Sequence, residues 1–123
     1  MKILLVDDSR STLVMTRRTL NELGFTDVTL AQDALVALDL IRTDRPDLII
    51  ADLNMPGMNG FELLVAVQDQ FGAIPIFFLT ASHDVVAHRR LRDAGATWVF
   101  KKPLKAELFS MSLDSIETPQ KSA

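Results

Sequence analysis

Short apolar runs alternate with longer amphipathic segments along the whole chain. The first, third and fourth runs are apolar nearly throughout, which is typical of strands covered by helices on both faces and therefore of a parallel sheet. The strands predicted in this way are Ile3–Val6, Val28–Ala31, Leu48–Ala51, Ile74–Leu79 and Trp98–Phe100.

The segments between these runs carry apolar residues at helical spacing. The first helix is expected to end at Gly24, the second to begin at the cap Asp33, and the third to end at Gly72. A fourth is expected at about 84–94 and a fifth at about 105–116. The residues assigned to their inner faces are Leu13, Met15 or Thr16, Leu20 and Leu23; Leu35, Leu38 and Ile41; Phe61, Leu64, Val65 and Phe71; Ala87, Leu91 and Ala94; and Leu108, Phe109, Leu113 and Ile116.

Strict alternation of strands and helices predicts an α/β fold with an open parallel sheet and right-handed crossovers. The 123 residues suit one domain with one core. We expect residues 1–117 to form this domain. The polar end, residues 118–123, is expected to be a flexible tail or the start of a linker.

Composition narrows the chemistry. The chain has no cysteine and two histidines, which excludes disulfides and Cys-ligated metals and leaves too few ligands for a typical catalytic zinc site. Its net charge of −3 gives no broad basic face for nucleic acid. No apolar run approaches the length of a membrane span, and the first run is too short for a signal peptide. We therefore expect a soluble cytoplasmic protein that binds neither nucleic acid nor membrane directly.

Polar side chains follow four of the predicted strands. Asp7 and Asp8 follow the first, Asp52 the third, Thr80 the fourth and Lys102 the fifth. The C-terminal ends of parallel strands share one edge, where ligands of open α/β sheets bind. Each residue alone is more often a helix cap or a surface charge. Their combination at one edge predicts a site of three acids, a hydroxyl and an ammonium group.

Such a cluster requires a cation. Two carboxylates roughly 4 Å apart repel each other by about 4 kcal/mol at an effective dielectric near 20. With only hard oxygen ligands available, the expected ion is Mg²⁺. Magnesium leaves positions for phosphate oxygens, so the cluster suits phosphoryl transfer, with Lys102 and Thr80 near those oxygens. Either one carboxylate is the nucleophile or all three are metal ligands. Asp52, which precedes a Gly-rich turn, is the acid expected at the centre.

The stretches KILLVDDS, DLIIADLNMPGMNGFEL, FFLTA and DAGAT…KKP together resemble the receiver domain of two-component response regulators, the CheY-like fold. The resemblance covers nearly the whole chain. It implies a doubly wound five-stranded parallel sheet in the order 2-1-3-4-5 with five helices. It also implies a signalling domain that catalyses only its own phosphorylation and dephosphorylation, with no external substrate.

The resemblance implies a role for each acid. Asp52 would be the phosphoacceptor, taking its phosphoryl group from the phosphohistidine of a sensor histidine kinase or a histidine phosphotransfer protein. Asp8, Asp52 and the backbone carbonyl of Asn54 would bind Mg²⁺, and Asp7 would act through water. The partners would be that phosphoryl donor and a downstream target protein or a missing output domain.

Further roles follow from the same resemblance. Lys102 would pair with the phosphoryl oxygens, and its bond to Pro103 would be cis. The Thr80 hydroxyl and the Ala81 amide would face the phosphoryl group. Asn54 and Ser82 are small and polar, which predicts that water reaches the site and that the phosphoryl group does not survive very long.

Two departures from the family pattern concern the switch. The usual aromatic residue, three positions before the lysine, is Val99, and strand alternation turns Trp98 to the other side of the sheet. A population shift of the face formed by the fourth helix, fifth strand and fifth helix is still expected to carry the signal. The fourth helix is basic, with His88, Arg89 and Arg92; it is either a solvated face or a surface for an acidic partner.

Three other functions compete with this interpretation. A haloacid-dehalogenase-like phosphatase would need a second acid two residues after its nucleophile, but Asp7 is followed at that distance by Ser9. A flavodoxin-like FMN binder would meet repulsion between its phosphate and the acids. The alternative closest to our prediction is a receiver-like interaction module that is not phosphorylated, and no residue of the sequence favours it.

Overall fold

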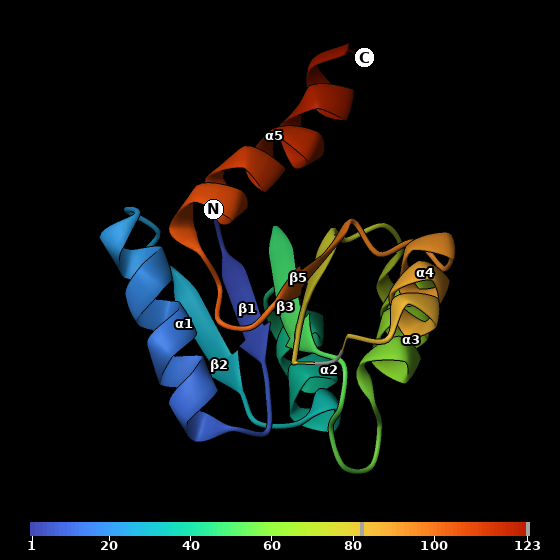
Figure 1. Ribbon diagram of the computed structural model, residues 1–123. Coiled ribbons are helices and arrows are strands. Elements are labelled where there is room, and N and C mark those ends of the chain that lie inside the picture. Colours follow the sequence, from blue (N-terminus) through green and yellow to red (C-terminus); the bar gives the residue numbers. More distant parts are fainter. Residues whose placement is uncertain (82, 123) are drawn as a thin grey trace.

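Five parallel strands form one sheet in the order β2-β1-β3-β4-β5, as the resemblance implies (Figure 1). The computed structural model describes residues 1–81 and 83–122, without the side chains of Ser115 and residues 117–122. The strands are β1 (Ile3–Val6), β2 (Val28–Ala31), β3 (Leu48–Asp52), β4 (Ile76–Thr80) and β5 (Trp98–Lys101).

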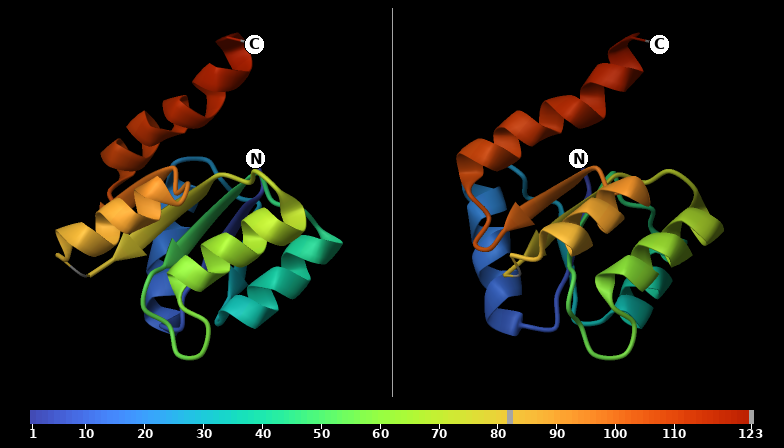
Figure 2. Two further views of the ribbon diagram at one scale, coloured as in Figure 1. Left: turned by 90° about the vertical axis from the view of Figure 1, so that its right-hand side faces the viewer. Right: turned by 45° about the vertical axis from the view of Figure 1, so that its right-hand side comes forward.

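Helices cover both faces of this sheet. They are α1 (Arg10–Glu22), α2 (Ala34–Thr43), α3 (Gly60–Phe71), α4 (Val85–Asp93) and α5 (Ala106–Ser122). Figure 2 shows α2, α3 and α4 side by side on one face, with α1 on the other. The core accordingly has two apolar clusters. One joins the sheet to α2, α3 and α4, and the other joins it to α1 and the first turns of α5.

Short polar side chains cap the starts of four helices. Asp33 accepts a hydrogen bond from the backbone of Val36 at 2.8 Å, as predicted for a cap. Ser9 and Asp84 cap α1 and α4 in the same way. Asn59 and Glu62 form a reciprocal capping box at the start of α3. These caps fix where each crossover begins relative to the C-terminal edge of the sheet.

The strand boundaries differ from the prediction by one or two residues. Strand β4 begins at Ile76 rather than Ile74, because Pro75 has no N–H to donate to a ladder. The Pro75 carbonyl still accepts a hydrogen bond from Ile49 at 2.9 Å. Strands β3 and β5 each continue one residue further, to Asp52 and Lys101.

Three of the predicted inner-face residues are wrong. Leu35, Val65 and Leu108 are exposed, at 66%, 40% and 47%. In α2 the buried stripe instead uses small residues, Ala34 and Ala37, beside the predicted Leu38 and Ile41. The prediction placed only large apolar side chains on the inner face of this helix and therefore missed the two alanines. In α1, where the sequence left two choices, the buried residue is Thr16.

Helix α5 is held near its start and extends away from the sheet (Figures 1 and 2). Phe109 is fully buried and makes edge-on ring contacts with Phe25 and Phe77, at centroid distances of 5.6 and 5.9 Å. The helix runs through most of residues 118–123, and Ala123 lies outside the described residues. The domain boundary after residue 117 stays a prediction. Within the described part of the chain, no helix combines the length and the apolarity that crossing a bilayer requires.

Candidate functional site

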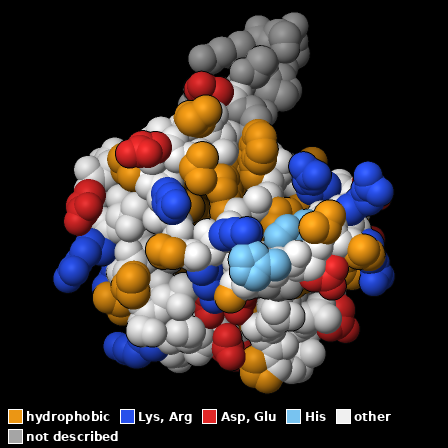
Figure 3. Space-filling model, viewed as in Figure 1, with side chains coloured by type: hydrophobic (Ala, Val, Ile, Leu, Met, Phe, Trp, Pro, Cys, Tyr) orange, Lys and Arg blue, Asp and Glu red, His pale blue; other side chains and the backbone are white. Residues whose placement is uncertain are grey.

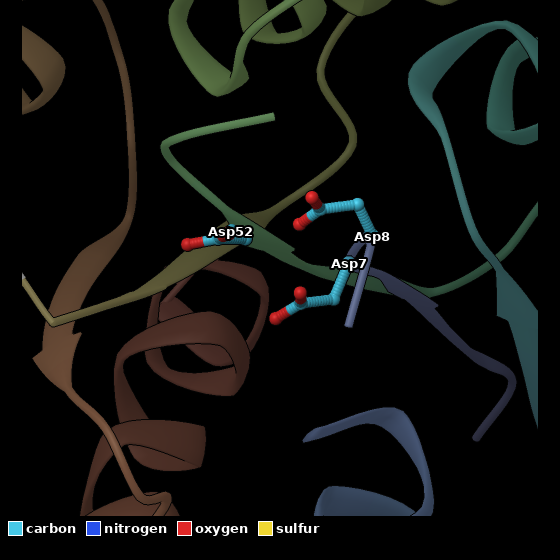
Figure 4. A group of neighbouring side chains, drawn as sticks. All are labelled: Asp7, Asp8 and Asp52. Atoms are coloured by element: carbon cyan, nitrogen blue, oxygen red, sulfur yellow. The ribbon is translucent and has the colours of Figure 1, made fainter. Parts of the chain in front are cut away.

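Three carboxylates meet at the C-terminal edge of the sheet. Strand β1 lies between β2 and β3, and Val6 pairs with Ala51, so the residues that follow lie side by side. One carboxylate oxygen each from Asp7, Asp8 and Asp52 falls within 4.8 Å of the others. Figure 4 shows the three side chains directed to the same side. The sequence prediction that these acids converge is confirmed.

Lys102 joins the cluster from the end of β5. Its Nζ lies 2.9 Å from Oδ2 of Asp7 and 3.4 Å from Oδ1 of Asp52. Its backbone N–H donates to the carbonyl of Thr80 at 3.0 Å, which ties the segment after β5 to the end of β4. The Lys102–Pro103 peptide bond is cis, as the resemblance implies.

Backbone groups hold the two buried acids. The second oxygen of Asp7 accepts a hydrogen bond from the Ser9 N–H at 2.9 Å. Asp52 accepts one from the backbone N–H of Asn54. Asp7 and Asp52 are only 4% and 6% exposed, whereas Asp8 is exposed. Thr80 is fully buried and ends β4 beside Lys101. The floor of the site, formed by Asp7, Asp52 and Thr80, is therefore buried and held in place, whereas the carboxylate of Asp8 faces solvent.

Burial and neighbouring charge set the ionisation of this floor. Burial, followed by the charge of Asp7, raises the pKa of Asp52, although Lys102 and the Asn54 N–H oppose the shift. For Lys102, burial lowers the pKa, but the hydrogen bond with Asp7 and the charges of both acids outweigh it, so that its pKa is raised. Ionised Asp52 is thus costly without a second cation, and this cost disappears as the pH falls through its raised pKa.

The donor set fits a hard divalent cation. All three candidate ligands are carboxylates, the grouping holds no sulfur or imidazole, and Asp8 is open to solvent on one side. Magnesium prefers such oxygen ligands and keeps several of its waters. Lysine neutralises only one of the three negative charges, so a net negative site remains for the ion. Asp7 is ion-paired with Lys102 in this arrangement, a contact that the sequence analysis did not predict.

Gly60 is the residue whose role the sequence analysis missed. A Cβ at this position would lie 2.6 Å from the Asp52 carbonyl oxygen and 2.8 Å from Leu53 Cα. Its N–H also donates to the Leu53 carbonyl at 2.8 Å. The start of α3 therefore packs directly on the backbone that carries Asp52. The available signal was a glycine at the first position of a helix, where its low helix propensity requires a packing reason.

The remaining predicted residues lie apart from this edge or beyond what is described. Trp98 and Val99 lie on β5, and Trp98 stacks with Phe100 while Val99 packs against the opposite cluster. His88 is half-buried on α4, and the neighbouring Arg89 and Arg92 are exposed. Ser82 lies outside the described residues, and the expectation that the phosphoryl group does not survive very long stays a prediction.

A doubly wound α/β sheet whose C-terminal edge carries a buried acid pair, a lysine and a buried threonine is typical of domains that transfer phosphoryl groups with a metal ion. The model of the response regulator receiver domain family matches residues 3–113. The chain belongs to this family. Receiver domains take a phosphoryl group as their signal, bind Mg²⁺ at an acidic pocket, and work with histidine kinases and output targets.

Individual proteins agree with this assignment. Response regulator MprA of Mycolicibacterium vanbaalenii is 40% identical over 106 residues, which are 86% of this chain and 46% of that protein. MprA of Mycobacterium avium is 38% identical over 107 residues, 87% of this chain and 46% of its own length. The chain thus spans slightly less than half the length of these relatives.

Solved structures show the same fold. Chemotaxis protein CheY4 of Vibrio cholerae has a TM-score of 0.82 and 36% identity, with 94% of this chain and 97% of that chain covered. The receiver domain of Francisella response regulator 1452 has a TM-score of 0.84 and 27% identity, with 96% and 98% covered. The fold that the resemblance implies is therefore shared with these proteins.

Proposed function

We propose that Asp52 is the phosphoacceptor of this receiver domain and that Asp8, Asp52 and the backbone carbonyl of Asn54 hold Mg²⁺, with Asp7 acting through water. The observation that carries the proposal is the position of Asp52. It is the buried acid that belongs both to the three-carboxylate group and to the Lys102 ion pair while ending a central strand.

The chemical step is a displacement at phosphorus. A carboxylate oxygen of Asp52 forms the new P–O bond, and the P–N bond of the phosphohistidine breaks. The imidazole nitrogen leaves with the electron pair of that bond and takes up a proton. Bound Mg²⁺ neutralises charge on the phosphoryl oxygens and orients them.

The chain's own residues supply the rest of this site. Lys102, already beside Asp52, pairs with the transferred oxygens. The Thr80 hydroxyl and the Ala81 N–H donate to the same group from the end of β4. Water enters on the side of Asp8, which is solvent-exposed, and hydrolyses the acyl phosphate again. The domain thus catalyses its own phosphorylation and dephosphorylation.

Partners and location belong to the same proposal. The donor is a sensor histidine kinase or a histidine phosphotransfer protein in the cytoplasm. Phosphorylation adds roughly −1.5 to −2 charge, and the resulting population shift reaches the face of α4, β5 and α5, which includes Trp98, Val99, His88, Arg89 and Arg92. The recipient is a target protein or an output domain of a longer chain.

Intact mass after incubation with acetyl phosphate tests the acceptor. We expect one phosphoryl adduct on the wild-type protein with Mg²⁺, no adduct with excess chelator, and none on Asp52→Asn. Asp33→Asn is the matched control, because Asp33 caps α2 and lies outside the three-carboxylate group; this variant should still be labelled.

Two results would contradict the assignment. Labelling of Asp52→Asn would move the acceptor to another residue. A folded wild-type protein that accepts no phosphoryl group, either from acetyl phosphate or from a phosphorylated kinase, would favour the interaction module that is never phosphorylated.

A further inference from the structure

Two small cavities lie between α1 and the C-terminal edge of the sheet. The inner cavity has a volume of about 10 Å³ and is lined by Asp7 and Asp52 together with Thr12 and Thr16. The outer cavity, of about 80 Å³, lies beside Lys102 and the two residues that follow it. Both cavities are lined by the same two threonines, so these side chains of α1 lie at the boundary between them.

The acid cluster therefore has a solvent side and a core side. On the solvent side Asp8 is exposed, and Figure 3 shows acidic side chains along the lower edge of this view, with lysine or arginine side chains beside them. On the core side the inner cavity is walled by buried apolar residues, among them Leu5, Leu13 and Ile50. The carboxylates and the threonine hydroxyls are the polar groups that meet in this otherwise apolar space.

Thr16 is distinguished by what its hydroxyl lacks. It is 6% exposed, and no hydrogen bond in the described part of the chain uses its hydroxyl. No fully shielded side-chain oxygen or nitrogen in that part lacks a partner, so the Thr16 oxygen must be accessible to water through a cavity that it lines. The threonines one turn away on the same helix face differ, because Thr12 donates to the Ser9 hydroxyl at 3.1 Å and Thr19 to the Met15 carbonyl at 3.3 Å.

We propose that Thr16 is a positioning residue of the phosphoryl-transfer site: its hydroxyl holds an internal water in the inner cavity, and this water binds the carboxylates of Asp7 and Asp52 from the core side. The role of the two acids rests on the proposed function. The inner cavity has about the volume that admits a single water molecule. Cavities lined by polar groups hold water, whereas purely apolar cavities of this kind stay dry.

The groups that line the inner cavity are complementary to a water molecule. An ionised carboxylate only accepts hydrogen bonds, while a threonine hydroxyl both donates and accepts. A water that accepts from Thr16 therefore has both of its own hydrogens for Asp7 and Asp52. Lys102 and backbone N–H groups already occupy part of each carboxylate. The internal water adds a contact on the core side and so fixes the orientation of both carboxylates.

This orientation affects the rate because the reacting oxygen of Asp52 must be in line with the bond that breaks at phosphorus. The internal water takes no part in the displacement itself. It lies on the core side of Asp52, whereas the water that hydrolyses the acyl phosphate enters beside Asp8. Removing one water-mediated hydrogen bond should therefore slow phosphorylation by about fivefold and not abolish it.

A buried threonine can instead be purely structural, with a methyl group that fills space. The two roles predict opposite orders for two substitutions at Thr16. Thr16→Val keeps the shape of the side chain and removes the hydroxyl, whereas Thr16→Ser keeps the hydroxyl and removes the methyl group. A positioning role makes Thr16→Val the slower variant in phosphoryl transfer, and a packing role makes Thr16→Ser the slower one.

The rate of labelling by acetyl phosphate and Mg²⁺, followed by intact mass, separates these roles. We expect Thr16→Val to be labelled about fivefold more slowly than the wild type, and Thr16→Ser to stay within about twofold of it. Thr19→Val is the matched control, because the Thr19 hydroxyl already bonds to the Met15 carbonyl and lines only the outer cavity; this variant should be labelled like the wild type.

A high-resolution crystal structure tests the water directly. It should show a water between Thr16 and the two acids in the wild type, and none there in Thr16→Val. An inner cavity without water, in a wild-type crystal that resolves other buried waters, overturns the inference whether or not the variants fold. Water confined to the outer cavity, without contact to Asp7 or Asp52, also overturns it.

The labelling rates overturn the inference in two further cases. Slower labelling of Thr16→Ser than of Thr16→Val assigns Thr16 to packing. Labelling of Asp52 at equal rates in the wild type and in Thr16→Val removes the positioning role and leaves the proposed function intact. Failure of the proposed function looks different, because the wild-type protein would then not be labelled on Asp52 at all, although the crystal would still show the internal water.

Discussion

The C-terminal edge of the sheet and the outer face formed by α4, β5 and α5 differ in how their side chains are held. At the edge, Asp7 and Asp52 are buried, bonded to backbone N–H groups and paired with one lysine. On the outer face, large side chains such as Met111 and Val85 are 70% and 76% exposed. The side chains at the edge are held in place at strand ends, and those of the outer face lie exposed on the surfaces of helices.

Under the proposed function, this difference follows from what each region does. Phosphoryl transfer needs oxygens and an ammonium group held within a narrow geometry, which strand ends and backbone hydrogen bonds provide. A surface that reports the reaction must change its contacts at a small free-energy cost, which favours elements with few buried anchors. The strongest tests of this contrast therefore remove one anchor from each region.

The largest effect is expected from Phe109, the anchor of α5. Phe109→Ala deletes a fully buried ring that contacts Phe25 and Phe77, and should lower the free energy of unfolding by about 3–5 kcal/mol. Met111→Ala, on the same helix, should cost no more than about 0.5 kcal/mol. Urea denaturation measures both. A loss under about 1 kcal/mol for Phe109→Ala would show that α5 is held by other contacts.

The next effect concerns the lysine at the edge. Lys102→Met leaves Asp7 and Asp52 facing each other and should destabilise the metal-free protein by about 3 kcal/mol, at the low end for a buried pair because the lysine is 22% exposed. Mg²⁺ should restore part of this loss, because it replaces the missing positive charge. Lys105→Met is the exposed control. Thermal unfolding with chelator measures the stability lost by the substitution, and thermal unfolding with Mg²⁺ measures how much of it the ion restores. If Mg²⁺ stabilises Lys102→Met no more than it stabilises the wild type, this electrostatic account is wrong.

The sequence also predicts the edge of the sheet better than the outer face. Asp7, Asp52, Thr80 and Lys102 could be assigned to one edge because a parallel sheet brings all strand ends together whatever the details of packing. The Asp7–Lys102 ion pair could not be predicted, because it depends on which carboxylate the lysine side chain contacts in the folded protein.

The outer face was harder to predict for a physical reason. Periodicity assigns a residue to a helix face only within the width of a turn, so Leu108 was placed inside although its side chain is exposed. The direction of α5 depends on where Phe109 packs, a tertiary contact that no local pattern contains. By contrast, the assignment of Trp98 and Val99 to opposite sides of the sheet followed from strand alternation and is confirmed.

A smaller effect is expected where α3 meets the site. Gly60→Ala places a methyl group against the Asp52 carbonyl and Leu53, and should cost about 2 kcal/mol while slowing labelling by acetyl phosphate. Gly57→Ala is the matched control, since Gly57 has a φ of +77° but open space around it. It should cost about 1 kcal/mol through backbone strain and leave the labelling rate unchanged. Equal labelling rates for the two variants would mean that the approach at Gly60 does not position Asp52.

The smallest effect tests how loosely α4 is held. The guanidinium of Arg90 lies 5.2 Å from the ring centroid of Phe61, a cation–π contact that joins α4 to α3. Because such contacts at exposed sites contribute about 0.5–1 kcal/mol, Arg90→Gln should speed amide hydrogen exchange in α4 roughly two- to fivefold. Arg89→Gln, which changes an exposed neighbour, should leave exchange as it is. If both variants exchange like the wild type, the contact between Arg90 and Phe61 does not hold α4, and the helix depends on other contacts such as the buried Leu91 and the hydrogen bond from Gln68 to the Ala94 carbonyl.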